Sequence, residues 1–169
     1  MSITVFCEVK DGAILPISFE GLGIGKKLAE ALGTDTAAII LGSNTGELSA
    51  KAIAQGADKV YTVDDAQLKE YQPDLYLNTL EKLFSDIKPQ IIIMGQTDTG
   101  RELAPRLAFR LNTEATLDCV ELTIDPASKR LLQTKPVYGG NARAVIVTDT
   151  DPQIVTIRTK AFTALTPDT

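Results

Sequence analysis

Two threonines, a glycine and two arginines lie close together in a stretch that could bind an anion or a partner's carboxylate. In chain order they are Thr97, Thr99, Gly100, Arg101 and Arg106. Thr99 and Glu102 have the spacing of a capping box, which marks the start of a helix. Free N–H groups and the positive end of the helix dipole favour an anion at such a start. The purely structural alternative is a capped helix with solvated arginines, because caps are common and arginines usually lie on surfaces.

Pro105 lies inside the first turns of this expected helix. A proline there lacks an N–H donor and crowds the carbonyl of Arg101. We therefore expect either a distorted first turn or a helix that begins near Ala104.

The elements around this stretch alternate between strands and helices over about the first 110 residues. Apolar β-branched runs predict buried parallel strands, and apolar side chains at helical spacing predict the helices between them. The sequence thus predicts an α/β fold, a parallel doubly wound sheet of the adenine nucleotide alpha hydrolase-like type with helices on both faces. The expected strands are 3–9, 37–41, 59–63 and 90–94, and the expected helices are 18–32 (capped by Ser18), 47–55, 73–87 and 99–111.

After Asn112 the alternation stops and short β-branched runs follow one another. These runs, 117–124, 130–137, 142–148 and 153–159, are separated by turn residues, a spacing typical of antiparallel hairpins. We expect residues 144–149 and 153–159 to pair around a turn at Asp151-Pro152. Residues 1–163 are expected to form a single domain, and 164–169 a tail or the start of a truncated linker.

Composition excludes several functions. The chain has 169 residues, no histidine, two cysteines and a net charge of −5. Without histidine there is no Ser-His or Cys-His machinery, so we expect no catalytic residues. The cysteines form no Cys-x-x-Cys pair, so no metal site is expected, and the acidic balance argues against nucleic acid. With no apolar run long enough to cross a bilayer and no secretory signal, we expect a cytoplasmic protein.

Two glycine-rich segments look at first like phosphate loops. Gly21, Gly23 and Gly25 fail that test, because a loop ending at Gly25 would need glycine where Glu20 stands. We interpret them as positions of close packing or a loose helix start. The segment 42–46 could approach a nucleotide, although a simple turn is the alternative interpretation.

Four further stretches resemble a known family. They are Gly56-Ala57-Asp58-Lys59-Val60, residues 97–108, Tyr138-Gly139-Gly140-Asn141-Ala142, and residues 156–162. In this order they are similar to the N-terminal domain of the alpha subunit of electron transfer flavoprotein, over residues 3–162. The family usually has proline at the position of Thr159, and its alpha subunit has a C-terminal FAD-binding domain that is absent here.

The resemblance implies a function as well as a fold. It implies part of an FAD-containing heterodimeric electron carrier, with the electron transfer flavoprotein beta subunit and acyl-CoA or other dehydrogenases as partners. This domain would mainly scaffold the complex and form the subunit interface, and it would bind no FAD tightly by itself; alone, it could form a homodimer. The cofactor-binding or interface residues that the resemblance implies are Thr97, Thr99, Gly100, Arg101, Arg106, Asn141 and Arg158. For the three arginines a structural salt bridge is the alternative interpretation.

A stand-alone adenine-nucleotide-binding module of the stress-protein type is the alternative. The loops after Leu41 and Met94 would hold the nucleotide. An exposed apolar surface on the isolated domain would discriminate between the two hypotheses, because an unpaired subunit interface leaves such a patch.

Overall fold

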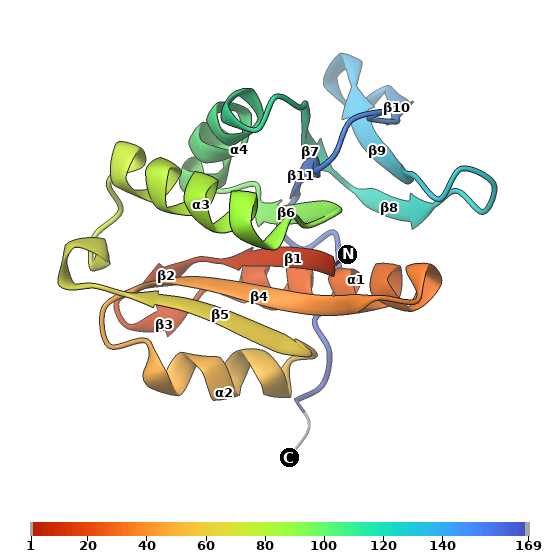
Figure 1. Ribbon diagram of the computed structural model, residues 1–169. Helices are drawn as coiled ribbons and strands as arrows, with labels where there is room; N and C mark the ends of the chain where they lie inside the picture. Colours follow the sequence, from red (N-terminus) through yellow and green to blue (C-terminus); the bar gives the residue numbers. More distant parts are fainter. Residues whose placement is uncertain (1, 168–169) are drawn as a thin grey trace.

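Six parallel strands form the central sheet of this protein (Figure 1), whose computed structural model describes residues 2–167. The strand order is β5-β4-β1-β6-β11-β7, and every pairing in it is parallel. The fold class predicted from the apolar runs is therefore confirmed. The six strands are β1 (Ser2–Cys7), β4 (Asp35–Gly42), β5 (Lys59–Asp64), β6 (Ile91–Gly95), β7 (Ala115–Cys119) and β11 (Gln153–Ile157).

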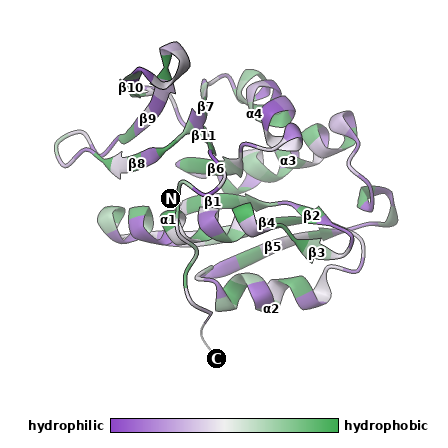
Figure 2. Cartoon of the chain, turned by 180° about the vertical axis from the view of Figure 1, so that it is seen from behind, coloured by the Kyte–Doolittle hydropathy of each residue, from purple (hydrophilic) through white to green (hydrophobic). Residues whose placement is uncertain are grey.

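Helices cover both faces of this sheet, as the doubly wound prediction requires. Successive side chains of a strand point to opposite faces, so Val5 of β1 joins one apolar core and Phe6 joins the other. In Figure 2, hydrophobic colour follows β1 and β6 through the middle of the molecule. The first core is covered by α1 (Pro16–Leu32) and α2 (Gly46–Ala54), and the second by α3 (Pro73–Ile87) and α4 (Asp98–Arg110).

The strand order reverses between β1 and β6. From β1 the chain passes through α1 to β4 on one side, whereas β6 begins the other half of the sheet. In open α/β sheets the loops diverge at such a switch point, and they leave a crevice at the carboxyl ends of the strands. The loops after Cys7 and Gly95 border this crevice.

A small antiparallel sheet lies beside the central one, and it corrects the predicted hairpin. Residues 142–146 pair with β9 and not with 153–157, which run parallel within the central sheet. All five residues of 153–157 are buried, which is the signature of an internal parallel strand. The small sheet has the order β10-β9-β8, with β8 (Glu121–Ile124), β9 (Leu131–Val137) and β10 (Ala142–Ile146).

Shorter elements complete the chain. The expected strand 117–124 is divided between β7 and β8, and Asp118 takes a positive φ of 66° within β7. The remaining elements are the β2 (Val9–Lys10) and β3 (Ala13–Ile14) hairpin and the short 3-10 helices η1 (Ala66–Leu68) and η2 (Tyr138–Gly140). Within residues 2–167, no helix combines the length and the apolar character needed to cross a membrane.

Two predicted helix starts are different in the structure. Helix α1 begins at Pro16, which suits the first helical position because its missing N–H would be unpaired there anyway. Ser18 is therefore not the cap; its hydroxyl accepts a hydrogen bond of 3.0 Å from the Glu8 backbone N–H. Helix α4 begins at Asp98 and runs through Pro105, so a start near Ala104 is also wrong.

The α1 glycines are packing positions, as one of the two interpretations predicted. A Cβ on Gly21 would lie 2.9 Å from Val5, and one on Gly25 would lie 3.1 Å from the same side chain. A methyl group at position 21 would force the Val5 side chain to shift, and one at position 25 would crowd it, so glycine allows α1 to pack closely on β1.

Candidate functional site

Glu8 and Thr97 meet at the switch point. Glu8 directly follows β1 and is only 6% exposed, and Thr97 ends the loop after β6. The Thr97 hydroxyl donates a hydrogen bond of 2.7 Å to Glu8 Oε1. Burial raises the pKa of the Glu8 carboxyl, because removal from water disfavours its charged form, and the hydrogen bond from Thr97 offsets part of this rise.

Thr97, and not Thr99, caps helix α4. Its side chain accepts a hydrogen bond of 3.0 Å from the Gly100 backbone N–H. The predicted capping box is wrong in its other half too, since Glu102 accepts from the Tyr71 hydroxyl at 3.2 Å. The cap thus satisfies one helix-start donor, and the Glu8 carboxyl lies next to it. This arrangement does not favour the anion that the helix start alone had suggested.

Gly100 permits a close approach that no other residue could make. A Cβ at this position would lie 1.9 Å from the carbonyl oxygen of Gly95, the last residue of β6. The first turn of α4 therefore packs directly on the end of its own preceding strand, and this contact fixes the loop between them.

A second polar cluster joins the ends of β7 and β11. The Arg158 guanidinium donates two hydrogen bonds to the Asp118 carboxylate, at 2.9 and 2.6 Å. The Asp118 N–H donates to the Thr156 hydroxyl at 2.8 Å, and that hydroxyl donates to the side-chain oxygen of Gln96. Arg158, with smaller contributions from Lys135 and Arg101, lowers the pKa of Asp118. We call these residues, with the first pair, the polar seam: Glu8, Gln96, Thr97, Asp118, Thr156 and Arg158.

The seven sequence-predicted site residues do not gather at one point. Five lie at the carboxyl edge of the sheet, on α4 or at the end of β11: Thr97, Thr99, Gly100, Arg101 and Arg158. Arg106 lies on the side of α4 that faces α3, where it pairs with Asp74 and lies 3.7 Å from Glu102. Asn141 is exposed at the turn between β9 and β10.

Arg101 is a predicted residue that is available to a partner. Its side chain is 62% exposed, and its contact with Asp98 is long, at 3.9 Å. A hollow of about 420 Å³ beside it is lined by Asp98, Arg101, Glu102 and Leu117. Two carboxylates in so open a hollow suit a protein surface better than they suit a phosphorylated cofactor.

Sequence reasoning missed Glu8 and Asp118. One signal for Glu8 was present, since a carboxylate that directly follows a buried parallel strand lies at the ligand edge of an α/β sheet. Asp118 carried no such signal, because its place at that edge depends on β7 pairing with β11.

The loop proposed for a nucleotide, residues 42–46, is already occupied by a carboxylate. Asp64 accepts hydrogen bonds from the backbone N–H of Asn44 at 2.9 Å and from that of Thr45 at 2.8 Å. The Thr45 hydroxyl also donates to it. Amides that would hold a phosphate are thus used within the protein, and the negative charge of Asp64 would repel one.

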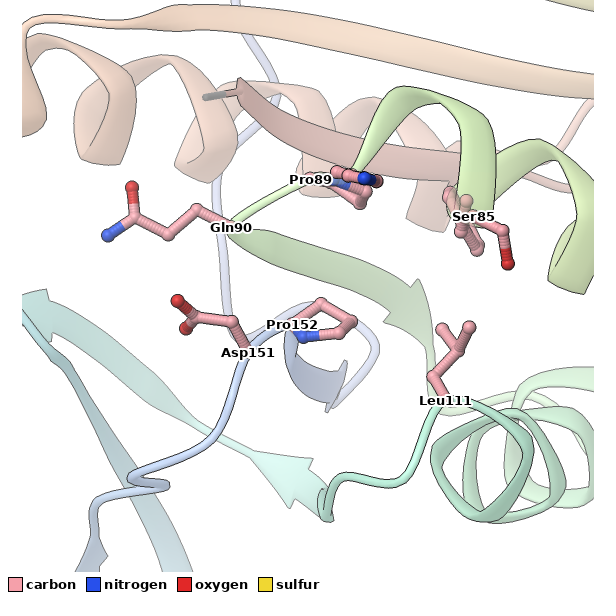
Figure 3. A pocket seen from close by; sticks show the side chains of 8 residues that line it. Ser85, Pro89, Gln90, Leu111, Asp151 and Pro152 are labelled. Carbon is pink, nitrogen blue, oxygen red and sulfur yellow. The ribbon is translucent and has the colours of Figure 1, made fainter.

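A cavity of about 480 Å³ lies at the opposite, amino-terminal edge of the sheet. Figure 3 shows Gln90 and Asp151 on one side of it and Leu111 on the other. Two of its polar side chains are engaged within the protein: Asp151 pairs with Arg130 at 2.7 Å, and the Ser85 hydroxyl donates to the Glu81 carbonyl. Apolar atoms make up most of the walls of the cavity.

Large apolar side chains are exposed on β10 and in the residues next to it. Tyr138 is 84% exposed, Val145 60% and Val147 42%. All three lie within residues 137–147, which we call the β9–β10 hairpin. Among residues 2–167, β10 pairs with β9 alone, so its outer edge has unpaired backbone groups. Exposed apolar edge strands are covered in most proteins, because they otherwise aggregate.

The fold and the site together define a class: a doubly wound α/β domain with a polar seam at the carboxyl edge of its sheet. Within residues 2–167 it also has an edge strand, β10, with exposed apolar side chains. The sequence model of the electron transfer flavoprotein domain matches residues 3–169. The chain belongs to this family, which confirms the resemblance seen in its motifs.

Curated relatives give the same result. The chain is 42% identical to electron transfer flavoprotein subunit alpha of Clostridium acetobutylicum over 164 residues, 96% of this chain and 49% of that protein. It is 39% identical to subunit LctC of lactate dehydrogenase (NAD(+),ferredoxin) of Acetobacterium woodii over 163 residues, 96% of this chain and 39% of that protein. Protein FixB of Clostridium saccharobutylicum is 37% identical over 168 residues, 98% of this chain and 50% of that protein. The chain thus spans about half the length of the curated relatives it matches, or less.

Proposed function

We propose that this chain acts as the N-terminal domain of an electron transfer flavoprotein alpha subunit. The complete protein is a heterodimer with a beta subunit, and it carries electrons through FAD between dehydrogenases and an acceptor. Family membership and the relatives named electron transfer flavoprotein subunit alpha support this function. The role of the domain is to scaffold the complex and to provide a subunit interface.

The exposed apolar β9–β10 hairpin is the observation that carries this proposal. Val145 and Tyr138 expose more than half of their surface, and the adjoining strand edge has free N–H and C=O groups. Burial of apolar surface drives most association between proteins, and a strand edge adds backbone hydrogen bonds to a partner. This face is therefore where we place the beta subunit.

We propose that this chain alone binds no FAD tightly. The Asp64 carboxylate occupies the loop amides of Asn44 and Thr45 that would otherwise suit a phosphate, and the hollow beside Arg101 is open and partly acidic. We therefore place the cofactor on other parts of the heterodimer, with Arg101 as a surface contact at most.

Association with a beta subunit tests the interface. The probe is the electron transfer flavoprotein beta subunit of Clostridium acetobutylicum, titrated against this chain in sedimentation velocity. We expect a one-to-one complex that Val145→Asp weakens at least about tenfold, since a charge must be desolvated in the contact. Ile53→Asp is the matched control, because Ile53 is 56% exposed and lies on α2. Equal binding by wild type and Val145→Asp would place the interface elsewhere.

The visible absorption spectrum tests the cofactor assignment. The purified chain is mixed with excess FAD, and free FAD is then removed on a desalting column. We expect a colourless protein, because the backbone amides of Asn44 and Thr45 already bind the Asp64 carboxylate. A retained yellow chromophore would contradict this assignment and would make the loop from Thr97 to Arg101 the first place to look for a flavin site.

A further inference from the structure

The chain does not run free after β11. It turns back along α1, and Figures 1 and 2 show it passing from the sheet to the carboxyl end of α2. We call residues 160–165 the strap. The Lys160 backbone N–H donates a hydrogen bond of 2.8 Å to Glu20 Oε2 on α1, and Phe162 packs half-buried against the apolar core beneath that helix.

Two glycines lie under the strap where side chains would collide with it. A Cβ on Gly23 of α1 would lie 2.3 Å from the Thr163 carbonyl oxygen and 3.4 Å from Ala164 Cα. A Cβ on Gly56, just after α2, would lie 2.5 Å from Cδ1 of Leu165, a side-chain end that can rotate away, and the positive φ of Gly56 also favours glycine there. Both Ala164 and Leu165 are partly buried as a result.

The three α1 glycines thus serve two different surfaces. Gly21 and Gly25 face Val5 of the sheet, as described above, whereas Gly23 faces the strap. Glycine inside a helix is unfavourable relative to alanine, so its presence at position 23 needs a reason. Contact with the strap backbone provides one, because a backbone atom cannot swing away as the end of a side chain can.

We propose that Glu20, Gly23 and Gly56 form a docking groove for the chain's own strap. The groove holds the polypeptide from Lys160 to Leu165 and brings it out beside the carboxyl end of α2. If a further domain follows, which rests on the proposed function, it pivots after Leu165 and not at the end of β11.

Limited trypsin digestion of the 169-residue chain tests the groove. We expect trypsin to cut after Lys160 when the strap leaves its seat, and the fragment ending at Lys160 is identified by its mass. We expect Gly23→Ala to raise the rate of this cut at least about tenfold, because the open population rises. Gly46→Ala is the control, since a Cβ there meets nothing within 4 Å, and it should leave the rate unchanged.

A second variant separates strap release from unfolding. Leu165→Asp changes only the strap, and it should also speed the cut after Lys160, with the thermal midpoint of the domain within a few degrees of wild type. Wild-type cleavage rates in both variants would overturn the proposal. The experiment needs neither FAD nor a beta subunit, so its failure would leave the proposed function untouched. Failure of the proposed function would likewise leave the groove untouched.

Discussion

Thr97 Oγ1 lies 2.7 Å from Glu8 Oε1, and these residues are 89 positions apart in the sequence. The same hydroxyl that donates to Glu8 accepts from the Gly100 backbone N–H at 3.0 Å. The Thr97 side chain therefore links the end of β1 to the first turn of α4 by hydrogen bonds at the switch point. The stability of this link can be tested at each of its members.

Replacement of Gly100 by alanine should be costly. The new Cβ would lie 1.9 Å from the Gly95 carbonyl oxygen, so α4 must move off its strand. Overpacking of this kind costs about 1–3 kcal/mol, and we expect about 3 kcal/mol because the opposing atom is backbone. Urea denaturation measures the loss, and Gly46→Ala is the control. A variant as stable as wild type would show that α4 shifts freely at this point.

Glu8→Gln should remove a pH dependence. The folded state raises the pKa of Glu8 above its ordinary value of 4.5, so the folded form holds that proton more tightly than the unfolded form. Its contribution to stability therefore falls as pH rises from that value through the folded pKa, and is constant above it. Glutamine still accepts from Thr97 but cannot ionise.

The measurement is the free energy of unfolding of wild type and Glu8→Gln between pH 4 and 8. The difference should grow in favour of the variant as pH rises and then level off. Glu114→Gln, at an exposed position, is the control for loss of a carboxylate. If the difference in free energy of unfolding does not change over this pH range, the pKa of Glu8 is not raised in the folded state.

The pair of Asp118 and Arg158 should show a measurable coupling. Their side chains are 29% and 48% exposed, and the contact is bidentate. A double-mutant cycle with Asp118→Asn and Arg158→Gln should give a stabilising coupling energy at pH 7, larger than that of a fully exposed ion pair. Asparagine tolerates the positive φ of residue 118, so the backbone is preserved.

This coupling should depend on pH in the opposite direction to that of Glu8. Arg158 holds the pKa of Asp118 below its ordinary value of 3.8, so the stabilisation is present above that value and is lost as pH falls through the folded pKa. The more exposed pair Lys59 and Asp35 provides a comparison, for which we expect a smaller coupling. Equal coupling energies for the two pairs would show that the bidentate contact adds no stability.

Both thiols should be unreactive in the folded protein. Cys7 and Cys119 are fully buried, and burial raises the pKa of each to about 12. The thiolate is the reactive form, so Ellman's reagent should modify them only through unfolding. Both thiols should then react in strong denaturant. Rapid modification of either cysteine in native buffer would show that the core opens locally around it.

Much of the fold could be predicted from sequence, because parallel strands and amphipathic helices have local signatures. The apolar run Ile91–Met94 and the helical spacing of 73–87 needed no knowledge of distant residues. The predicted antiparallel pairing of Gln153–Ile157 was wrong, because pairing depends on distant residues. A short β-branched run indicates a strand but does not name its neighbour, and here tertiary packing places it between β6 and β7.

The candidate site could be predicted only in part for the same physical reason. The helix start near Thr97 was visible, because cap residues act within a few positions. Its partner Glu8 belongs to a strand that approaches only after the sheet forms. The strap carried no apolar period, since its seat is made by glycines on other elements, Gly23 and Gly56.

Hydrogen exchange of β10 tests the subunit role most directly. Backbone amides of residues 142–147 are measured by mass spectrometry in this chain alone and with the beta subunit of Clostridium acetobutylicum. A partner that covers the β9–β10 hairpin must slow exchange there, while residues 46–54 of α2 stay unchanged. That result is the one predicted. Unchanged exchange in β10 at saturating beta subunit, or protection confined to α2, would contradict the interface on which the proposed function rests.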